Sequence, residues 1–190
     1  MTLTVPPLGI EIVLLAVLLV AAVYDVRFRR IPNWITVTGV ALGLLLNAFL
    51  SGPPGAWFSF AGVWFSLRGL GLAFGVYFLL HVIRAMGAGD VKLMAAVGAL
   101  VGWQDWLGIF LITAVLGGVM GLILIASHGR VRKTLGNVVF ILTEMISGRP
   151  AYIKKEELDV RNPKAMGLPH GAVIGVGTVF FLVVATHFAR

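Results

Sequence analysis

The stretch "GAGDVKLMAAVGALVGW" (residues 87–103) places an aspartate at the edge of an apolar segment. Its apolar part, Val91–Gly102, has twelve residues. That is roughly 18 Å of helix, against a hydrocarbon core of about 30 Å. A helix this short either thins the bilayer or begins below its surface. We therefore expect Asp90 to lie recessed in a wet cavity between helices, with Lys92 reaching towards the interface.

The composition of the chain indicates a membrane protein. Of its 190 residues, 59% are hydrophobic and only 12% are charged, about half the charged share of a soluble domain. The apolar residues form separate blocks of membrane-spanning length. We therefore expect an all-α fold over residues 1–190, a single domain with about six transmembrane helices. The absence of cysteine excludes disulfides, thiolate metal sites and a cysteine nucleophile.

Hydropathy predicts where the membrane segments lie. The expected segments are Leu8–Tyr24, Trp34–Leu50, Gly69–Ile83, Val91–Trp103, Trp106–Ser127 and Gly171–Phe188. Residues 57–67 are apolar too, but Arg68 follows them and would mark the outer interface. We expect 57–67 to lie in that interface or re-enter it; one helix over 57–83 is the alternative. Interfacial belt positions are expected for Trp34, Trp57, Trp103 and Trp106.

The distribution of Lys and Arg predicts the orientation. With the N-terminus outside, the inner loops hold thirteen of the fifteen Lys and Arg residues, leaving Arg68 and Arg190 outside. This split follows the positive-inside rule, so residues 128–170 are expected to form a cytosolic loop. The net charge of +7 then reflects topology and lipid contact, and no nucleic-acid partner is expected. The first segment does not resemble a signal peptide, and we expect it to be retained.

Residues 131–146 have the pattern of an amphipathic helix. The apolar side chains on one helical face are Val131, Leu135, Val138, Val139, Leu142, Met145 and Ile146. We expect this helix to rest on the inner membrane surface; packing against the bundle is the alternative.

Glycines four residues apart occur in five of the expected segments. The pairs are Gly39/Gly43, Gly71/Gly75, Gly98/Gly102, Gly117/Gly121 and Gly171/Gly175. Small residues at this spacing let helix backbones approach closely in lipid. We expect these glycines to act in packing rather than in chemistry.

Only two of the eight acidic residues fall at inner ends of membrane segments, namely Asp25 and Asp90. The others are placed near the outer end of the first helix (Glu11), in an outer turn (Asp105) and in the large loop (Glu144, Glu156, Glu157 and Asp159). Ionisable groups at such membrane positions are costly and tend to be functional. The alternative is that both are solvated helix-end residues.

Two facing carboxylates that share a proton suit peptide hydrolysis. The ionised acid takes a proton from water, while the protonated acid polarises the scissile carbonyl. The helix dipoles favour an ionised Asp90 and a protonated Asp25, although the arginines at 27, 29 and 30 act in the opposite direction on Asp25. No metal is expected, because the histidines at 81, 128, 170 and 187 lack a paired ligand spacing. Gly87 and Gly89 would allow the turn that sets Asp90 at the cavity floor.

Two motifs carry a family resemblance. "YDVRFRRIPNWIT" (24–36), followed by the stretch at 87–103, resembles the type IV prepilin peptidase family of GxGD aspartyl proteases. That family pairs an aspartate seven residues before the Pro of an "IPN" turn with the aspartate of "GxGD". Asp25 stands seven residues before Pro32, and Asp90 ends the second motif. The resemblance therefore implies a GxGD-type fold in which these two aspartates are catalytic.

The resemblance extends to "GLPHGAVIGVG" (167–177), which looks like the last segment of the family. The family often has "PYG" where this chain has Pro169, His170 and Gly171, so His170 is a departure from the pattern. In size the chain looks like the small class that serves Flp-type (tight-adherence) pili, and it is similar to archaeal preflagellin peptidases.

The resemblance implies an activity and a place for it. A short basic leader would be removed from a prepilin-like substrate with an N-terminal hydrophobic helix, at the cytosolic face of the bacterial inner membrane, without a cofactor. Pro32 and Asn33 would shape the turn that positions Asp25. Lys92, Arg27, Arg29 or Arg30 could contact an acidic residue of the substrate, the alternative being that such basic residues only anchor to lipid.

Two other functions stay open from the sequence. A small transporter or channel could use Asp25 and Asp90 to bind a cation. An intramembrane protease that cuts within a helix would need both aspartates near the middle of the bilayer, whereas hydropathy places them near its inner edge.

Overall fold

The computed structural model describes residues 6–52, 57–83, 85–127 and 169–188, together with Arg132, Gly136, Val139, Phe140 and Thr143. Its helices are α1 (Leu8–Phe28), α2 (Asn33–Leu50), α3 (Phe60–Val82), α4 (Ala88–Ser127) and α6 (His170–Phe188). The described residues contain no strand, and five helices are long and apolar enough to cross a membrane. The expected all-α, multi-spanning fold is confirmed.

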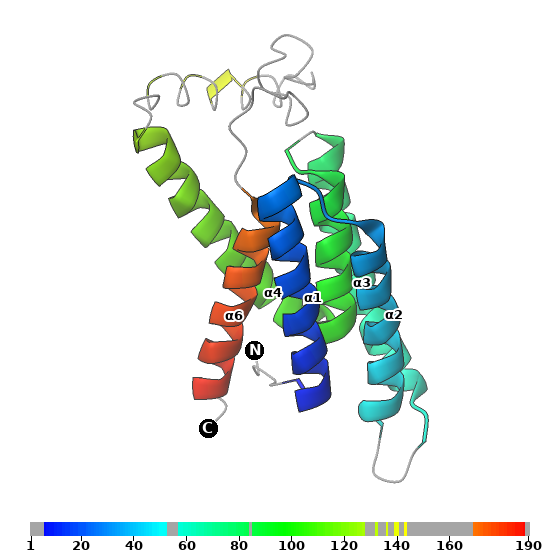
Figure 1. Ribbon diagram of the computed structural model, residues 1–190. Coiled ribbons are helices and arrows are strands. Elements are labelled where there is room, and N and C mark those ends of the chain that lie inside the picture. Colours follow the sequence, from blue (N-terminus) through cyan, green and yellow to red (C-terminus); the bar gives the residue numbers. More distant parts are fainter. Residues whose placement is uncertain are drawn as a thin grey trace.

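The forty-residue helix α4 replaces two of the expected segments. Its backbone is not helical at Gly102, where φ is 76° and ψ is 177°. Figure 1 shows α4 reversing direction in its course, so that both its ends lie at the same end of the bundle. A straight helix of this length would extend about 60 Å, twice the hydrocarbon thickness. The expected count of six separate segments is not confirmed, because one broken helix takes the place of two.

Helix α3 begins earlier than the sequence suggested. The Ser59 side chain caps it by accepting a hydrogen bond from the Gly62 N–H at 3.1 Å. The helix then continues without a break through Arg68, whose guanidinium lies 5.4 Å from the Trp64 ring centroid. The prediction of a separate interfacial segment over 57–67 is therefore wrong, and the single-helix alternative is the better description.

Two residues just after the α4 break are buried rather than interfacial. Asp105, expected in an outer turn, lies within α4 and is 3% exposed. Trp106, expected in an aromatic belt, is fully buried and packs edge-on against Tyr77 of α3. Because the chain already turns at Gly102, both residues belong to the second half of α4 and face its neighbours.

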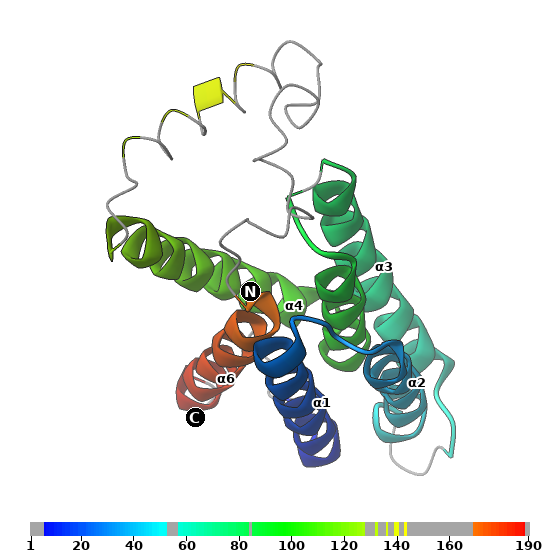
Figure 2. The same ribbon diagram turned by 45° about the horizontal axis from the view of Figure 1, so that its top comes forward.

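The close glycine contacts of the two halves of α4 are with different helices, although Trp106 of the second half also packs against Tyr77 of α3. In the first half, Gly98 meets Gly69 of α3. Ala99 meets Gly43 of α2, since a Cβ on Gly43 would lie 2.8 Å from the Ala99 carbonyl carbon. In the second half, Gly108 meets Phe181 of α6. Figures 1 and 2 show α6 between α1 and the second half of α4, with α2 and α3 beside the first half.

The glycine pairs differ in their packing. Gly43 and Gly98 stand at close helix contacts, as predicted. A Cβ on Gly71 or Gly75 would meet no described atom within 4 Å, so the packing predicted for that pair is wrong. The close-contact glycines of α3 are Gly62 and Gly69, where a Cβ would overlap the Asn47 and Gly98 carbonyl oxygens, respectively.

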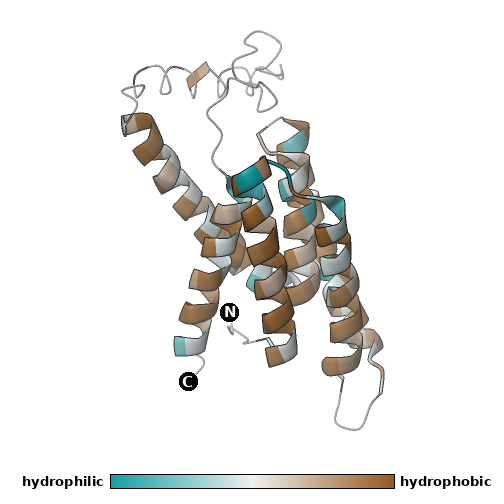
Figure 3. Cartoon of the chain, in the orientation of Figure 1, coloured by the Kyte–Doolittle hydropathy of each residue, from teal (hydrophilic) through white to brown (hydrophobic). Residues whose placement is uncertain are grey.

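The ends of α1, α4 and α6 that concern the site lie together. Figure 1 shows the end of α1 and the beginnings of α2, α4 and α6 at one end of the bundle. In Figure 3 the hydrophilic colouring gathers at the end of α1 and along its connection to α2. Of the predicted amphipathic helix 131–146, the five described residues are helical. The other residues of the predicted helix, and most of the predicted loop 128–170, lie outside the described residues.

Candidate active site

Asp25 stands in the last turn of α1 and is 8% exposed. The helix ends at Arg29, which adopts the left-handed conformation with φ of 53° and donates its N–H to the Asp25 carbonyl at 2.9 Å. Pro32 then precedes the first residue of α2, a place where its missing N–H and restricted φ are compatible with a helix start. This short connection sets the end of α1 that carries Asp25 beside the start of α2.

Asp90 stands in the first turn of α4. A Cβ on Gly87 would lie 3.1 Å from Asp90 Oδ2, and one on Gly89 would lie 3.3 Å from the Ile31 Cβ. Among the described glycines, only Gly102 has a positive φ. Gly87 and Gly89 therefore leave space for Asp90 and Ile31, whereas the unusual backbone angles anticipated from the sequence are not present at either glycine.

One cleft of about 700 Å³ is lined by both aspartates. Its lining residues are Tyr24, Asp25, Phe28, Arg29, Arg30, Ile31, Pro32, Asn33, Gly87, Ala88, Gly89, Asp90 and Lys92. Asp25 and Asp90 are also close enough to interact electrostatically. The structure thus brings together two carboxyl groups that are 65 positions apart in the chain.

The beginning of α6 completes the surroundings of the two acids. The Gly171 N–H donates a hydrogen bond of 2.7 Å to Asp25 Oδ2, and a Cβ on Gly171 would lie 3.1 Å from the Asp25 Cβ. The preceding residue, His170, interacts electrostatically with Asp90. The sequence showed His170 only as a departure from a family pattern and did not indicate these contacts.

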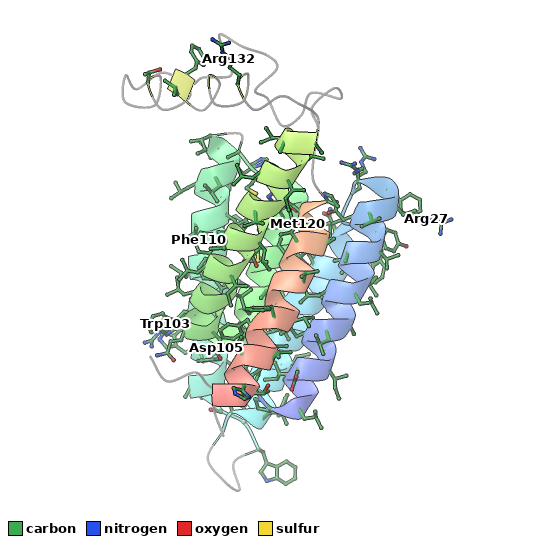
Figure 4. The ribbon with its side chains drawn as sticks, turned by 90° about the vertical axis from the view of Figure 1, so that its left-hand side faces the viewer. Arg27, Trp103, Asp105, Phe110, Met120 and Arg132 are labelled. Atoms are coloured by element: carbon green, nitrogen blue, oxygen red, sulfur yellow. The ribbon has the colours of Figure 1, made fainter. Side chains whose placement is uncertain are left out.

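The basic residues predicted to contact substrate separate into two groups. Lys92 lines the cleft and donates from Nζ to Asn33 Oδ1 at 2.9 Å, which joins α4 to α2. Arg27 is absent from the cleft lining, and Figure 4 shows it pointing outwards from the bundle. Its guanidinium lies 5.6 Å from the Phe28 ring centroid. Arg29 and Arg30, which the sequence also offered as substrate contacts, line the cleft.

The arrangement offers carboxyl chemistry rather than an evident metal site. Within the described parts of the chain, no three His, Asp or Glu side chains gather as metal ligands would. Two neighbouring carboxyl groups can instead hold one proton between them. Such a pair provides a general base and a general acid at the same place.

Comparisons with known proteins show which family the sequence of this chain matches. Residues 12–122 match the model of the type IV leader peptidase family. A prepilin leader peptidase/N-methyltransferase from Klebsiella pneumoniae is 36% identical over 106 residues, covering 53% of this chain and 43% of the relative. A preflagellin peptidase from Methanococcus voltae is 32% identical over 84 residues, covering 44% and 34%. No solved structure matches.

The matches cover part of each protein. The chain spans about two fifths of the length of the curated relatives, for example 43% and 40% of the first two. The matched family region contains both Asp25 and Asp90. With five apolar helices and relatives from bacteria, the chain has the features of an inner-membrane protein. None of these comparisons supports a cation transporter or channel.

Proposed function

Because the chain belongs to the type IV leader peptidase family, we propose that it is an aspartic endopeptidase in which Asp25 and Asp90 form the catalytic pair. Its substrate would be a prepilin-like precursor, from which it removes a short basic leader. The observation that supports this proposal best is that the two acids, from α1 and α4, line the same cleft and interact electrostatically.

The proposed reaction needs one ionised and one protonated carboxyl group. The ionised group accepts a proton from a water molecule, whose oxygen attacks the scissile carbonyl carbon. The protonated group donates its proton to the carbonyl oxygen, which gives a neutral tetrahedral intermediate. When this intermediate collapses, the carbon–nitrogen bond breaks: the carboxyl group that took the proton from water gives it to the leaving amine, and a hydroxyl proton of the intermediate returns to the other carboxylate. Both acids are then ready for another cycle.

Which acid carries the shared proton stays a prediction. The sequence favours an ionised Asp90, at the N-terminus of α4, and a protonated Asp25, at the C-terminus of α1. In the structure, the N-terminus of α6 also lies at Asp25, because the Gly171 N–H donates a hydrogen bond to Asp25 Oδ2. Infrared spectroscopy of the carboxyl stretch at pH 7 tests the assignment: the protonated-acid band should vanish in Asp25→Asn and persist in Asp90→Asn. The reverse pattern would assign the proton to Asp90.

The remaining cleft residues are proposed to shape the site or contact substrate. Pro32 and Asn33 would hold the turn after Asp25, while Gly87 and Gly89 would leave room beside Asp90. Lys92 lies on the cleft wall and is better placed to contact substrate than Arg27, which points outwards. A cytosolic location for the cleft is proposed from the Lys and Arg distribution, with the beginning of α1 on the outer side.

The central experiment is co-expression with a prepilin that carries a short basic leader. The native chain should convert the precursor to a faster-migrating product. Asp25→Asn and Asp90→Asn should each lower the cleavage rate by at least about 100-fold, the usual effect of losing a general acid or base. Membrane levels and thermal unfolding of each variant should be measured beside the native chain, to separate a loss of catalysis from a loss of folding.

Glu11→Gln is the matched control for the Asp25 variant. It neutralises another acid of the same helix, fourteen residues earlier or about 21 Å away along the axis. It should leave processing unchanged. Full processing by either Asp→Asn variant would remove that residue from the catalytic pair. A cation transporter would instead show no processing and would be stabilised thermally by its ion.

A further inference from the structure

A second hollow lies between α1 and α6 and is lined only by apolar residues. Its volume is about 630 Å³, and its walls include Leu15, Leu18 and Ala22 of α1 and Ala172 and Val179 of α6. We propose that this α1–α6 groove holds the apolar helix of a membrane-anchored substrate while the adjoining peptide bond reaches Asp25. The proposal rests on the proposed peptidase function and names the surface by which its substrate is bound.

The α1 wall of the groove leads directly to Asp25. Leu15, Leu18 and Ala22 follow one another at spacings of three and four residues, and Asp25 comes three residues later. Residues at this spacing lie on the same face of a helix. The groove therefore runs along the face of α1 that ends at the carboxyl group.

The α6 wall reaches the same carboxyl group. Ala172 lines the groove, and its neighbour Gly171 donates its N–H to Asp25 Oδ2 at 2.7 Å. Asp25 also lines the catalytic cleft. Its side chain thus stands where the apolar groove meets the polar cleft, so that a chain lying along the groove continues into the site.

The groove has the chemistry and the length that an apolar helix needs. Its α6 wall extends from Ala172 to Val183, about 16 Å or three helical turns. Small residues (Ala22, Ala172 and Gly175) occupy the end near Asp25, and small residues let helix backbones come close in lipid. An acyl chain would also fit an apolar surface, but it presents no peptide bond to the acid at the end of the groove.

Gly175 allows the groove to be filled without disturbing the core. A Cβ at this position would have its nearest neighbours at 3.9 Å (Ala22 Cβ) and 4.0 Å (Leu18 carbonyl oxygen). Gly175→Leu therefore adds a branched side chain in the groove itself. The matched control is Gly71→Leu on α3, where a Cβ would meet no described atom within 4 Å.

The test compares two substrates with these two variants. One is a full prepilin with its hydrophobic helix; the other is a soluble peptide that spans only the leader and the cleavage site. For Gly175→Leu we expect KM for the full prepilin to rise by about tenfold or more, with peptide cleavage unchanged. Gly71→Leu should change neither. Equal slowing of both substrates by Gly175→Leu, or slowing of neither, would overturn the proposal.

Cross-linking gives a second measurement that does not depend on activity. The chain has no cysteine, so Val179→Cys in the groove can be paired with single cysteines placed along the prepilin helix in an Asp90→Asn background. Val119→Cys on α4 is the control, because the two valines are similarly exposed, at 46% and 48%. Disulfide formation with Val179→Cys alone supports the groove. Absence of cross-linking points to lipid in the groove and contradicts the proposal. Equal cross-linking of Val179→Cys and Val119→Cys also contradicts it. Either result leaves the peptidase function standing.

Discussion

The two sides of the bundle are packed in different ways. Where α2 and α3 meet the first half of α4, backbones touch: a Cβ on Gly69 would overlap the Gly98 carbonyl oxygen, and Asn47 Nδ2 lies 3.1 Å from each of the Ala99 and Leu100 carbonyl oxygens. Where α1 meets α6, a Cβ on Gly175 would still be 3.9 Å from its nearest neighbour. One side is a tightly packed scaffold, and the other leaves an apolar groove open.

This difference in packing gives the two catalytic candidates, Asp90 and Asp25, different surroundings. Asp90 begins α4, whose first half is held by the scaffold, so its position is set by backbone contacts that leave little room for adjustment. Asp25 ends α1, whose contact with α6 near the site includes the Gly171–Asp25 hydrogen bond of 2.7 Å. A fixed acid beside an acid that borders an open groove fits the proposed docking of a membrane-anchored substrate.

The largest expected effect is the loss of a scaffold glycine. In Gly69→Ala, the new methyl group would collide with the backbone of Gly98 and with the Gly102 Cα, 2.7 Å away. Backbone atoms cannot move aside as a flexible side chain can, so we expect the free energy of unfolding in detergent to fall by about 3 kcal/mol. Gly175→Ala and Gly71→Ala should each change it by less than about 0.5 kcal/mol. Similar losses for Gly69→Ala and Gly175→Ala would show that the two sides are equally tight.

The next effect concerns the break in α4. Gly102 has φ of 76° and ψ of 177°, a region that is essentially restricted to glycine and costs about 1–3 kcal/mol for a residue with a Cβ, and its Cβ would overlap the Phe65 ring. Gly102→Ala should lower the unfolding free energy by about 2–3 kcal/mol. Combining it with Phe65→Ala separates the two causes. If the double variant loses as much as the sum of the single variants, the ring makes no contribution.

A smaller effect is expected from the polar contact inside the scaffold. Asn47 is 1% exposed, and its amide nitrogen also lies 2.9 Å from the Gly43 carbonyl oxygen. Interhelical hydrogen bonds in membrane proteins contribute about 0.6–1.7 kcal/mol, so Asn47→Leu should lower the unfolding free energy by about 1 kcal/mol. Thr186→Val is the control, because among the described residues the Thr186 hydroxyl bonds to its own helix, at the Val183 carbonyl oxygen. An equal loss in both variants would contradict a bridging role for Asn47.

The smallest effect is expected at the rim of the cleft. The hydrogen bond from Lys92 Nζ to Asn33 Oδ1 is exposed, and such bonds contribute about 0.5 kcal/mol or less. A double-mutant cycle of Lys92→Met with Asn33→Ala should give a coupling energy of that size. The cycle with Arg27→Met in place of Lys92→Met should give no coupling energy, because Arg27 points away from the cleft. Equal coupling in both cycles would show that the effect comes from general charge rather than from this contact.

Hydropathy and motif spacing predicted the all-helical membrane fold and a shared site for Asp25 and Asp90. Both depend on short stretches of chain, because an apolar block and an acid at its edge can be recognised locally. A turn was expected near Asp105, between the segments Val91–Trp103 and Trp106–Ser127, but its position at Gly102 was not, since a glycine after "GALV" is equally compatible with a continuing helix. The burial of Asp105 and Trp106, at 3% and 0% exposed, follows from this earlier turn and was not predicted. Figure 4 places Asp105 at the opposite end of the bundle from Arg27, and hence from the end of α1.

By itself, the sequence determined that this chain resides in a membrane, where most of its apolar helices run, and which two acids stand at the ends of helices on one side. Only the tertiary structure decided which faces meet. It placed the Gly171 N–H on Asp25, His170 near Asp90, Arg27 outside the cleft and an open groove beside α1. The physical reason is that hydropathy is a sum over neighbouring residues, whereas helix contacts depend on backbone approach between segments far apart in the chain.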